Sequence, residues 1–71
     1  MTEQQVANTM EMLGTMAKIN AFECKYEYLE RYGERIDHHE FVYLLDELRT
    51  RGVLVALRNG MDCTEYAMKG A

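Results

Sequence analysis

The sequence has no serine, no proline and no tryptophan among its 71 residues. Without serine there is no G-x-S-x-G nucleophile motif, and neither a glycine-rich phosphate loop nor an H-E-x-x-H motif occurs. The aspartates and glutamates are numerous, but they spread along predicted helix surfaces as solvating charge. A chain this short also offers little room for a deep pocket. We therefore predict a protein that is not an enzyme, with no catalytic residue, no cofactor and no metal site.

Long apolar runs are also missing, since no stretch approaches the ~20 residues that span a bilayer. The first residues, MTEQQVANT, lack the basic and apolar parts of a signal peptide. The two cysteines, Cys24 and Cys63, are far apart, which is typical of a cytosolic chain with reduced thiols. A disulfide between them would need a Cα separation under ~7 Å. We expect a cytoplasmic protein with no membrane partner.

The length and the hydrophobic content of 48% predict one globular domain, residues 1–71, near the lower size limit for a self-sufficient core. The formal net charge is −4. That balance argues against a strong non-specific grip on nucleic acid, because such a grip depends on neutralising phosphates. A local basic patch is still compatible with it.

The clearest helix signal begins at Asp37, whose carboxylate is suited to cap the first turn, and Glu40 completes a capping-box pattern. An apolar stripe with helical spacing follows at Phe41, Leu44, Leu45 and Leu48. Arg49 and Arg51 lie in the last turn, where cations are favoured by the helix dipole. Gly52 is suited to the position just after the helix.

A β-hairpin is predicted directly after this helix. The apolar run 53–57 favours a strand, Asn59-Gly60 favours a type I′ turn, and the return strand runs roughly from Asp62 to Met68. A two-residue loop would pair Val53 with Tyr66. A three-residue bulged loop would pair Leu54 with Tyr66 and Arg58 with Asp62. Both registers stay open here, and a slip of one residue reverses which face is buried.

A first helix is predicted after Thr2, with Gln5 in the capping-box position. Its apolar stripe comprises Val6, Met10, Leu13 and Ala17. Gly14 costs about 1 kcal/mol relative to alanine inside a helix, so it marks close packing, a kink or an early end. The methionines of this region are Met1, Met10, Met12 and Met16. They fit either a flexible core filler or an adaptable apolar surface for a second copy of the chain.

A second helix is predicted from Asn20, with Glu23 three residues on, to Gly33. The side chains expected to face inward are Phe22, Tyr26, Leu29 and Tyr32. The segment from Gly33 to Asp37 is short, as in the turn of a helix-turn-helix. The predicted order is therefore helix, helix, turn, helix, strand, strand.

The pattern Leu45-x-x-Leu48-x-x-x-Gly52-Val53-Leu54, followed by a polar turn and Thr64-Glu65-Tyr66-x-Met68, resembles the end of a winged helix-turn-helix domain. The resemblance covers about half of the chain. It implies an α+β fold with a small trihelical helix-turn-helix core followed by a C-terminal two-stranded β-hairpin wing. The family's usual short strand between the first two helices has no room in this sequence.

The resemblance also implies binding to double-stranded DNA and a role in transcription regulation, with the third helix in the major groove. The residues carried over by position are Arg35, His38, His39, Tyr43, Arg49, Arg51, Arg58 and Asn59. Three acids on the same helix, Asp37, Glu40 and Asp46, would repel phosphates unless each pairs with an arginine or reads a cytosine amino group. A weak binder of this kind would act as a homodimer through the methionine-rich first helix.

The alternative prediction is a protein-interaction module. An acidic face comprising Asp37, Glu40, Val42, Tyr43 and Asp46 suits a basic or mixed protein partner, and aromatic side chains are common interface anchors. A small acidic protein of a phage or mobile element that docks on a host nucleic-acid-binding complex would fit this description.

The adjacent residues His38 and His39 are the candidate metal ligands of the sequence. Adjacent helical residues diverge by about 100°, whereas zinc-binding helices usually present ligands three or four residues apart. The sequence therefore predicts that these two histidines do not share an ion.

Overall fold

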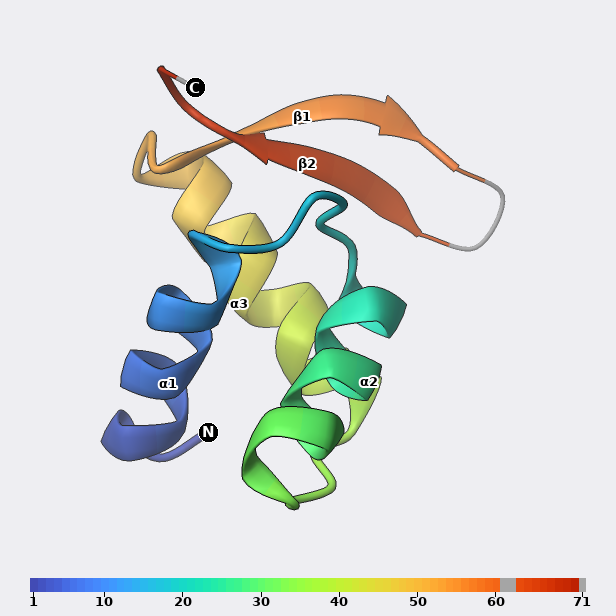
Figure 1. Ribbon diagram of the computed structural model, residues 1–71. Helices are drawn as coiled ribbons and strands as arrows, with labels where there is room; N and C mark the ends of the chain where they lie inside the picture. The colour runs from blue at the N-terminus through green and yellow to red at the C-terminus, as the bar shows by residue number, and fades with distance from the viewer. Residues whose placement is uncertain (61–62, 71) are drawn as a thin grey trace.

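The computed structural model describes residues 1–60 and 63–70. Three helices, α1 (Glu3–Leu13), α2 (Ala21–Tyr32) and α3 (His38–Thr50), precede an antiparallel hairpin of β1 (Leu54–Asn59) and β2 (Thr64–Met68). The predicted α+β class and element order are confirmed. The hairpin lies across the end of the helical layer at which α1 and α3 finish and α2 begins (Figure 1).

Helix α1 begins as predicted, because the Thr2 hydroxyl accepts from the Gln5 N–H at 3.1 Å and the Gln5 side chain accepts from the Thr2 N–H at 2.8 Å. Its last residue is Leu13 and Gly14 is the C-cap, so of the three roles considered for Gly14 the glycine marks an early end of the helix. Ala17 is exposed and lies beyond the helix, so the predicted stripe through Ala17 is wrong. The buried residues of α1 are Thr9, Met12 and Leu13.

Helix α2 has the predicted caps, since Asn20 accepts from the Glu23 N–H at 2.8 Å and Gly33 has a positive φ of 68°. Its inward face was predicted wrongly. The buried residues are Ala21, Cys24 and Tyr28, whereas Tyr26 is 61% exposed. Two apolar stripes share this helix, and the one that contains Cys24 and Tyr28 packs against the core. The buried Tyr28 hydroxyl accepts from the Asn8 amide at 3.1 Å, so its polar atom has a partner.

Helix α3 buries the stripe that the sequence predicted, Phe41, Leu44, Leu45 and Leu48. Asp37 caps it by accepting from the His39 N–H at 2.9 Å. The predicted capping box is absent among the described contacts. The Glu40 carboxylate binds the Met1 ammonium at 3.0 Å and does not return to the cap. Gly52 has the expected left-handed conformation, with φ of 81°.

Neither predicted hairpin register is observed. Leu54 pairs with Met68, Ala56 with Tyr66, and Asn59 with Thr64, with an irregularity between Ala56 and Arg58. Asn59 therefore belongs to the ladder, and neither it nor Gly60 has the positive φ that a type I′ turn needs. The expected strand start at Asp62 lies outside the described residues. Gly60 is required for a different reason, because a Cβ there would lie 2.7 Å from the Cys63 carbonyl oxygen.

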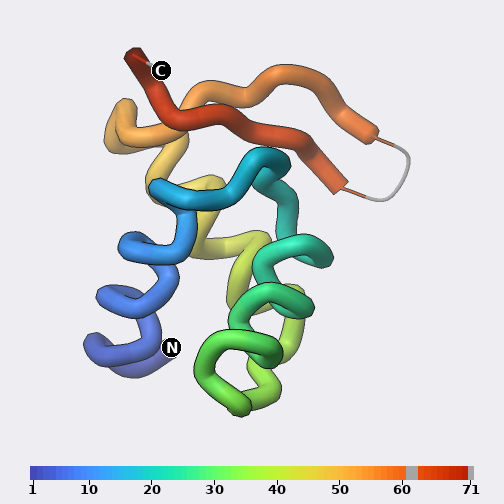
Figure 2. The backbone as a smooth tube through the Cα atoms, viewed as in Figure 1, coloured from blue at the N-terminus to red at the C-terminus, as the bar shows by residue number. Residues whose placement is uncertain are grey.

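One contact joins the hairpin to the α1–α2 connection. The Tyr66 N–H donates to the Ile19 carbonyl at 2.9 Å in an isolated antiparallel bridge. This single residue occupies the place where the sequence left no room for a strand. The tube in Figure 2 shows the connection passing along β2. Ile19, Leu54 and the buried residues of the three helices form one core.

Cys24 is buried and Cys63 is half-buried, and both are free thiols, as predicted. No helix within residues 1–60 and 63–70 is long and apolar enough to cross a membrane.

Candidate nucleic-acid interface

Helix α3 carries three exposed strips, because successive residues turn by about 100° around its axis. The outermost strip comprises His39, Tyr43, Asp46 and Thr50. A second strip faces the hairpin, where Val42 lines a hollow together with Cys63, Thr64 and Tyr66. The third faces α1, where Glu40 and Glu47 line a groove. The helix therefore offers a continuous surface to the hairpin on one side and to α1 on the other.

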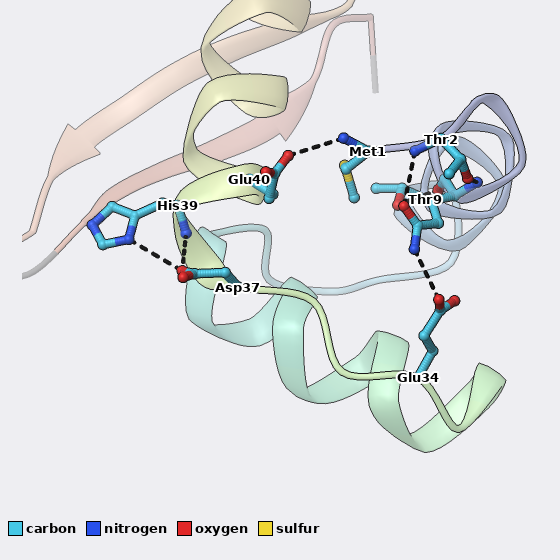
Figure 3. Close-up of polar contacts among 8 residues, drawn as sticks. Met1, Thr2, Thr9, Glu34, Asp37, His39 and Glu40 are labelled. Atoms are coloured by element: carbon cyan, nitrogen blue, oxygen red, sulfur yellow. Dashed lines mark hydrogen bonds and ion pairs between the residues drawn. The ribbon is translucent and has the colours of Figure 1, made fainter.

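The acidic side chains between residues 37 and 51 all have a partner. Asp46 binds Arg49 at 2.9 Å, and Glu47 binds Arg51 at 2.6 Å. Glu40 is turned toward α1 and the N-terminal ammonium (Figure 3). The Asp46 carboxylate raises the pKa of Arg49 by its hydrogen bond and its charge. These acids form separate pairs along the helix, so their charges are locally balanced.

At the start of α3, two histidines gather around Asp37. Its Oδ1 lies 3.1 Å from Nδ1 of His39 and 3.6 Å from Nδ1 of His38. The two imidazole rings are 4.2 Å apart between centroids, so the prediction that they diverge is wrong. The reason is that both rings bend toward the capping carboxylate. The hydrogen bond from the His39 backbone N–H is the main cause that lowers the pKa of Asp37.

The hairpin holds its predicted contact residues in cross-strand pairs. Arg58 binds Glu65 through two hydrogen bonds, Nε to Oε2 at 3.0 Å and Nη2 to Oε1 at 3.3 Å. Asn59 accepts from the Thr64 hydroxyl at 2.9 Å. The hydrogen bond from Arg58 lowers the pKa of Glu65. The Arg58 side chain is still 72% exposed, so a ligand can reach it.

The predicted arginines do not meet at one point. Arg35 precedes α3, while Arg49 and Arg51 lie near its end, about 20 Å along a helix of 13 residues. Arg58 lies on β1. Arg35 is exposed and makes no ion pair with residues 1–60 or 63–70. Cations therefore lie at both ends of α3 and on the hairpin, a spread arrangement that suits an extended polyanion better than a small ligand.

Comparison with known proteins gives one informative similarity. No family model and no curated protein matches the chain. A solved chain, described as "the complex structure of hsRosR-S1", superposes with a TM-score of 0.75 at 27% sequence identity. The similarity covers 99% of this chain and 61% of that one, so this chain spans about three fifths of the solved chain's length. Together with the three helices and the hairpin, this decides the fold. The chain is a winged helix-turn-helix domain.

In this winged helix-turn-helix domain, the excess of acid lies away from α3 and the wing. Residues 1–34 contain six acidic and three basic side chains, whereas residues 35–71 contain six and five. The formal charges of the two parts are therefore −3 and −1. Most of the net charge of −4 belongs to α1, α2 and their connection.

Sequence reasoning missed Lys18 as part of the wing surface. Its ammonium lies 3.7 Å from Oε1 of Glu65, the carboxylate that also binds Arg58. The Ile19–Tyr66 bridge brings Lys18 to β2. No local pattern signals this, because the two segments are distant in sequence and the bridge depends on the hairpin register.

Proposed function

We propose that this winged helix-turn-helix domain binds double-stranded DNA and acts in transcription regulation. The observation that carries the proposal is that acids and bases nearly balance in residues 35–71, the part of the chain that contains α3 and the wing. The similarity of 99% of this chain to the chain described as the complex structure of hsRosR-S1 supports the winged helix-turn-helix fold on which the proposal rests.

The proposed contacts divide by chemistry. His38, His39 and Tyr43 would reach bases or phosphates from the start and outer strip of α3, and Asn59 from the wing. Cationic phosphate contacts would come from Arg35, Arg49, Arg51 and Arg58. The last three arginines bind acids in the free protein, but exposed ion pairs contribute little and are readily exchanged for phosphate.

We further propose that the DNA-binding form is a homodimer, because two copies double the phosphate contacts. The first helix was the predicted interface. Met12 is fully buried in the core, so such an interface would use the partly exposed Met10 and Met16. Analytical ultracentrifugation of the purified chain tests this, and a monomer at the concentrations that bind DNA would exclude it.

The test of DNA binding is a fluorescence-anisotropy titration of the chain against mixed duplex DNA at low and moderate salt. We expect binding that weakens steeply with salt, because phosphate contacts release counterions. Arg58→Ala should weaken binding and flatten the salt dependence. Arg31→Ala is the matched control, since it removes another exposed, glutamate-paired arginine from α2. Absence of binding at low salt would contradict the proposal.

A second candidate function is protein binding, and one feature favours it. The groove between α1 and α3, about 210 Å³, has an apolar floor that includes Val6 and Leu44, and Glu40 and Glu47 at its sides. Tyr43, 76% exposed, lies beside it. This groove suits a basic protein segment, as in an inhibitor that docks on a nucleic-acid-binding complex. The other residues of the predicted acidic face lie elsewhere on α3: Val42 lines the hollow toward the hairpin, and Asp37 and Asp46 are paired with His39 and Arg49. A pull-down in which Tyr43→Ala abolishes capture would favour this function over DNA binding.

A further inference from the structure

The start of α3 brings three metal-ligating side chains together. Asp37, His38 and His39 each offer one ligand atom, and these three atoms lie within 4.8 Å of one another. They are consecutive in sequence, yet the capping conformation of Asp37 points its carboxylate back toward both rings. In a regular helix, adjacent side chains such as those of His38 and His39 diverge by about 100° and would not form this cluster.

Two of the three donor spacings, those from Asp37 to each histidine, are close to those of a coordination shell. Donors bound to zinc at about 2.0–2.1 Å in a tetrahedral site lie about 3.3–3.4 Å from each other. The Asp37 Oδ1 atom is 3.1 Å from Nδ1 of His39 and 3.6 Å from Nδ1 of His38. Both distances differ from the ideal by only a few tenths of an ångström. Rotation of the exposed His39 ring, whose side chain is 70% accessible, can close the remaining separation.

Two contacts restrict the ligands before any ion binds. The His38 ring stacks on Phe22 of α2, with centroids 4.8 Å apart and an interplanar angle of 19°. Asp37 is fixed by the hydrogen bond from the His39 backbone N–H (Figure 3). Such outer contacts orient ligands and reduce the entropy lost on coordination. Glu40 points toward Met1, so it does not compete for the same ion.

We propose that Asp37, His38 and His39 form a surface site for a divalent transition-metal ion such as Zn²⁺. Two imidazoles with one carboxylate favour zinc, copper, nickel or cobalt over magnesium and calcium, which prefer all-oxygen sets. Three protein ligands leave at least one coordination position for water or an external oxygen. The carboxylate offsets the unfavourable interaction between a cation and the positive end of the helix dipole.

The site has a consequence that rests on the proposed DNA-binding function. A bound divalent ion adds two positive charges where α3 begins, two residues after the exposed Arg35 in the sequence. Its open coordination position accepts a phosphate oxygen. Metal binding would then strengthen attachment to DNA at the end of α3 that otherwise carries the Asp37 carboxylate.

The decisive experiment is calorimetric titration of ZnCl₂ into the tag-free chain, with amide chemical shifts followed by NMR in parallel. We expect one saturable equivalent, with shifts centred on residues 37–39. His39→Gln and Asp37→Asn should each weaken binding by at least about tenfold, since loss of even an outer-shell contact costs ten- to a hundredfold. Asparagine is a good N-cap, so Asp37→Asn keeps the start of the helix.

Two control variants separate this site from other zinc-binding groups. Asp46→Asn removes an exposed carboxylate from the same helix, and Cys63→Ser removes the half-buried thiol. Both should bind zinc as the wild type does. Absence of saturable binding up to millimolar zinc, unchanged binding in His39→Gln, loss of binding in Cys63→Ser, or equal binding of MgCl₂ would each overturn the proposal.

A second measurement separates the metal site from the DNA function. Zinc should raise the affinity for duplex DNA in the wild type but not in His39→Gln. If zinc binds at residues 37–39 and DNA affinity does not change, the metal site stands and its proposed effect on DNA is wrong. If the chain binds no DNA at all, the proposed function fails while the calorimetric result still decides the metal site.

Discussion

The Glu65 carboxylate on β2 is the residue whose removal tests the wing most sharply. It accepts two hydrogen bonds from Arg58 and lies 3.7 Å from the Lys18 ammonium. Under the proposed function, one acid therefore competes with DNA phosphates for two exposed cations. Glu65→Gln keeps the size and polarity of the side chain and removes its charge. The two cations are exposed, and the Glu65 side chain, 19% accessible, keeps a hydrogen-bonding oxygen in this variant, so we expect little change in the free energy of unfolding.

The expected gain in DNA affinity follows from counterion release. One additional phosphate contact steepens the dependence of log K on log salt by about 0.9. If that contact contributes nothing at 1 M salt, affinity rises about fourfold at ~200 mM salt and about fifteenfold at ~50 mM salt. Releasing both Arg58 and Lys18 would double the change in slope. The gain should vanish at high salt, which separates it from any effect on folding.

The assay is fluorescence anisotropy with one duplex at four or more salt concentrations. Glu27→Gln is the matched control, because it frees Arg31 from a similar 2.6 Å ion pair on α2 and changes the net charge equally. An equal gain in both variants would mean that net charge alone acts. Unchanged affinity and slope in Glu65→Gln would refute the wing contact. In the double variant with Arg58→Ala, the share of the gain due to Arg58 should disappear, and any remainder is due to Lys18.

Three predictions concern stability. Leu45→Ala removes a side chain with no exposed surface, so we expect a loss of about 2–5 kcal/mol and a largely unfolded chain by circular dichroism. Burial raises the pKa of Cys24 from 9.0 to about 12, so above pH 9 the unfolded chain loses a proton that the folded chain keeps. Stability should be unaffected below pH 9 and fall by about 1.4 kcal/mol by pH 10 in urea titrations, with Cys24→Ala abolishing this slope. Gly60→Ala should lower the melting temperature, because its Cβ would meet the Cys63 carbonyl oxygen at 2.7 Å, whereas Gly14→Ala, with its nearest contact at 3.6 Å, should not.

Local signals predicted the elements well. The caps at Thr2 and Asn20 and the stripe through Phe41 and Leu45 depend on residues within one or two turns, and all are confirmed. Each involves a hydrogen bond or a periodicity that a single helix defines by itself. The order of elements and the winged helix-turn-helix resemblance followed from them.

Two features that local sequence patterns did not predict, the buried face of α2 and the hairpin register, depend on tertiary packing. Helix α2 has aromatic residues on both possible faces, and burial of Cys24 and Tyr28 was chosen by the neighbouring helices. The hairpin register depends on a loop four residues long and on the Ile19–Tyr66 bridge, not on the Asn59-Gly60 signal. At the end of the hairpin next to α3, Leu54 pairs with Met68, two residues beyond the partner Tyr66 that the three-residue loop predicted. A shift of two residues keeps the paired side chains on the same face of the hairpin, and Leu54 is buried in the core.

The candidate site was predicted as a set of residues but not as an arrangement of charges. The ion pairs of Arg49 and Arg51 connect neighbours on one helix turn and follow from spacing. The pairing of Arg58 with Glu65 needs the register, and the gathering of His38 and His39 needs the non-helical conformation of Asp37. Ideal helix geometry fails at a cap, which is where the metal-ligating cluster lies.

Composition alone made DNA binding look unfavourable, but the placement of charge changes that inference. A net charge of −4 would oppose DNA if it were spread evenly. The described acids of α3 and the wing, Glu40, Asp46, Glu47 and Glu65, are paired within the chain, whereas Glu3, Glu11 and Glu30 on α1 and α2 make no ion pair with the described residues. Repulsion of DNA by the excess acid is then screened over distances near the Debye length, about 8 Å at physiological salt. The paired surface itself can exchange acid for phosphate at little cost, so the local charges, and not the total, set the affinity.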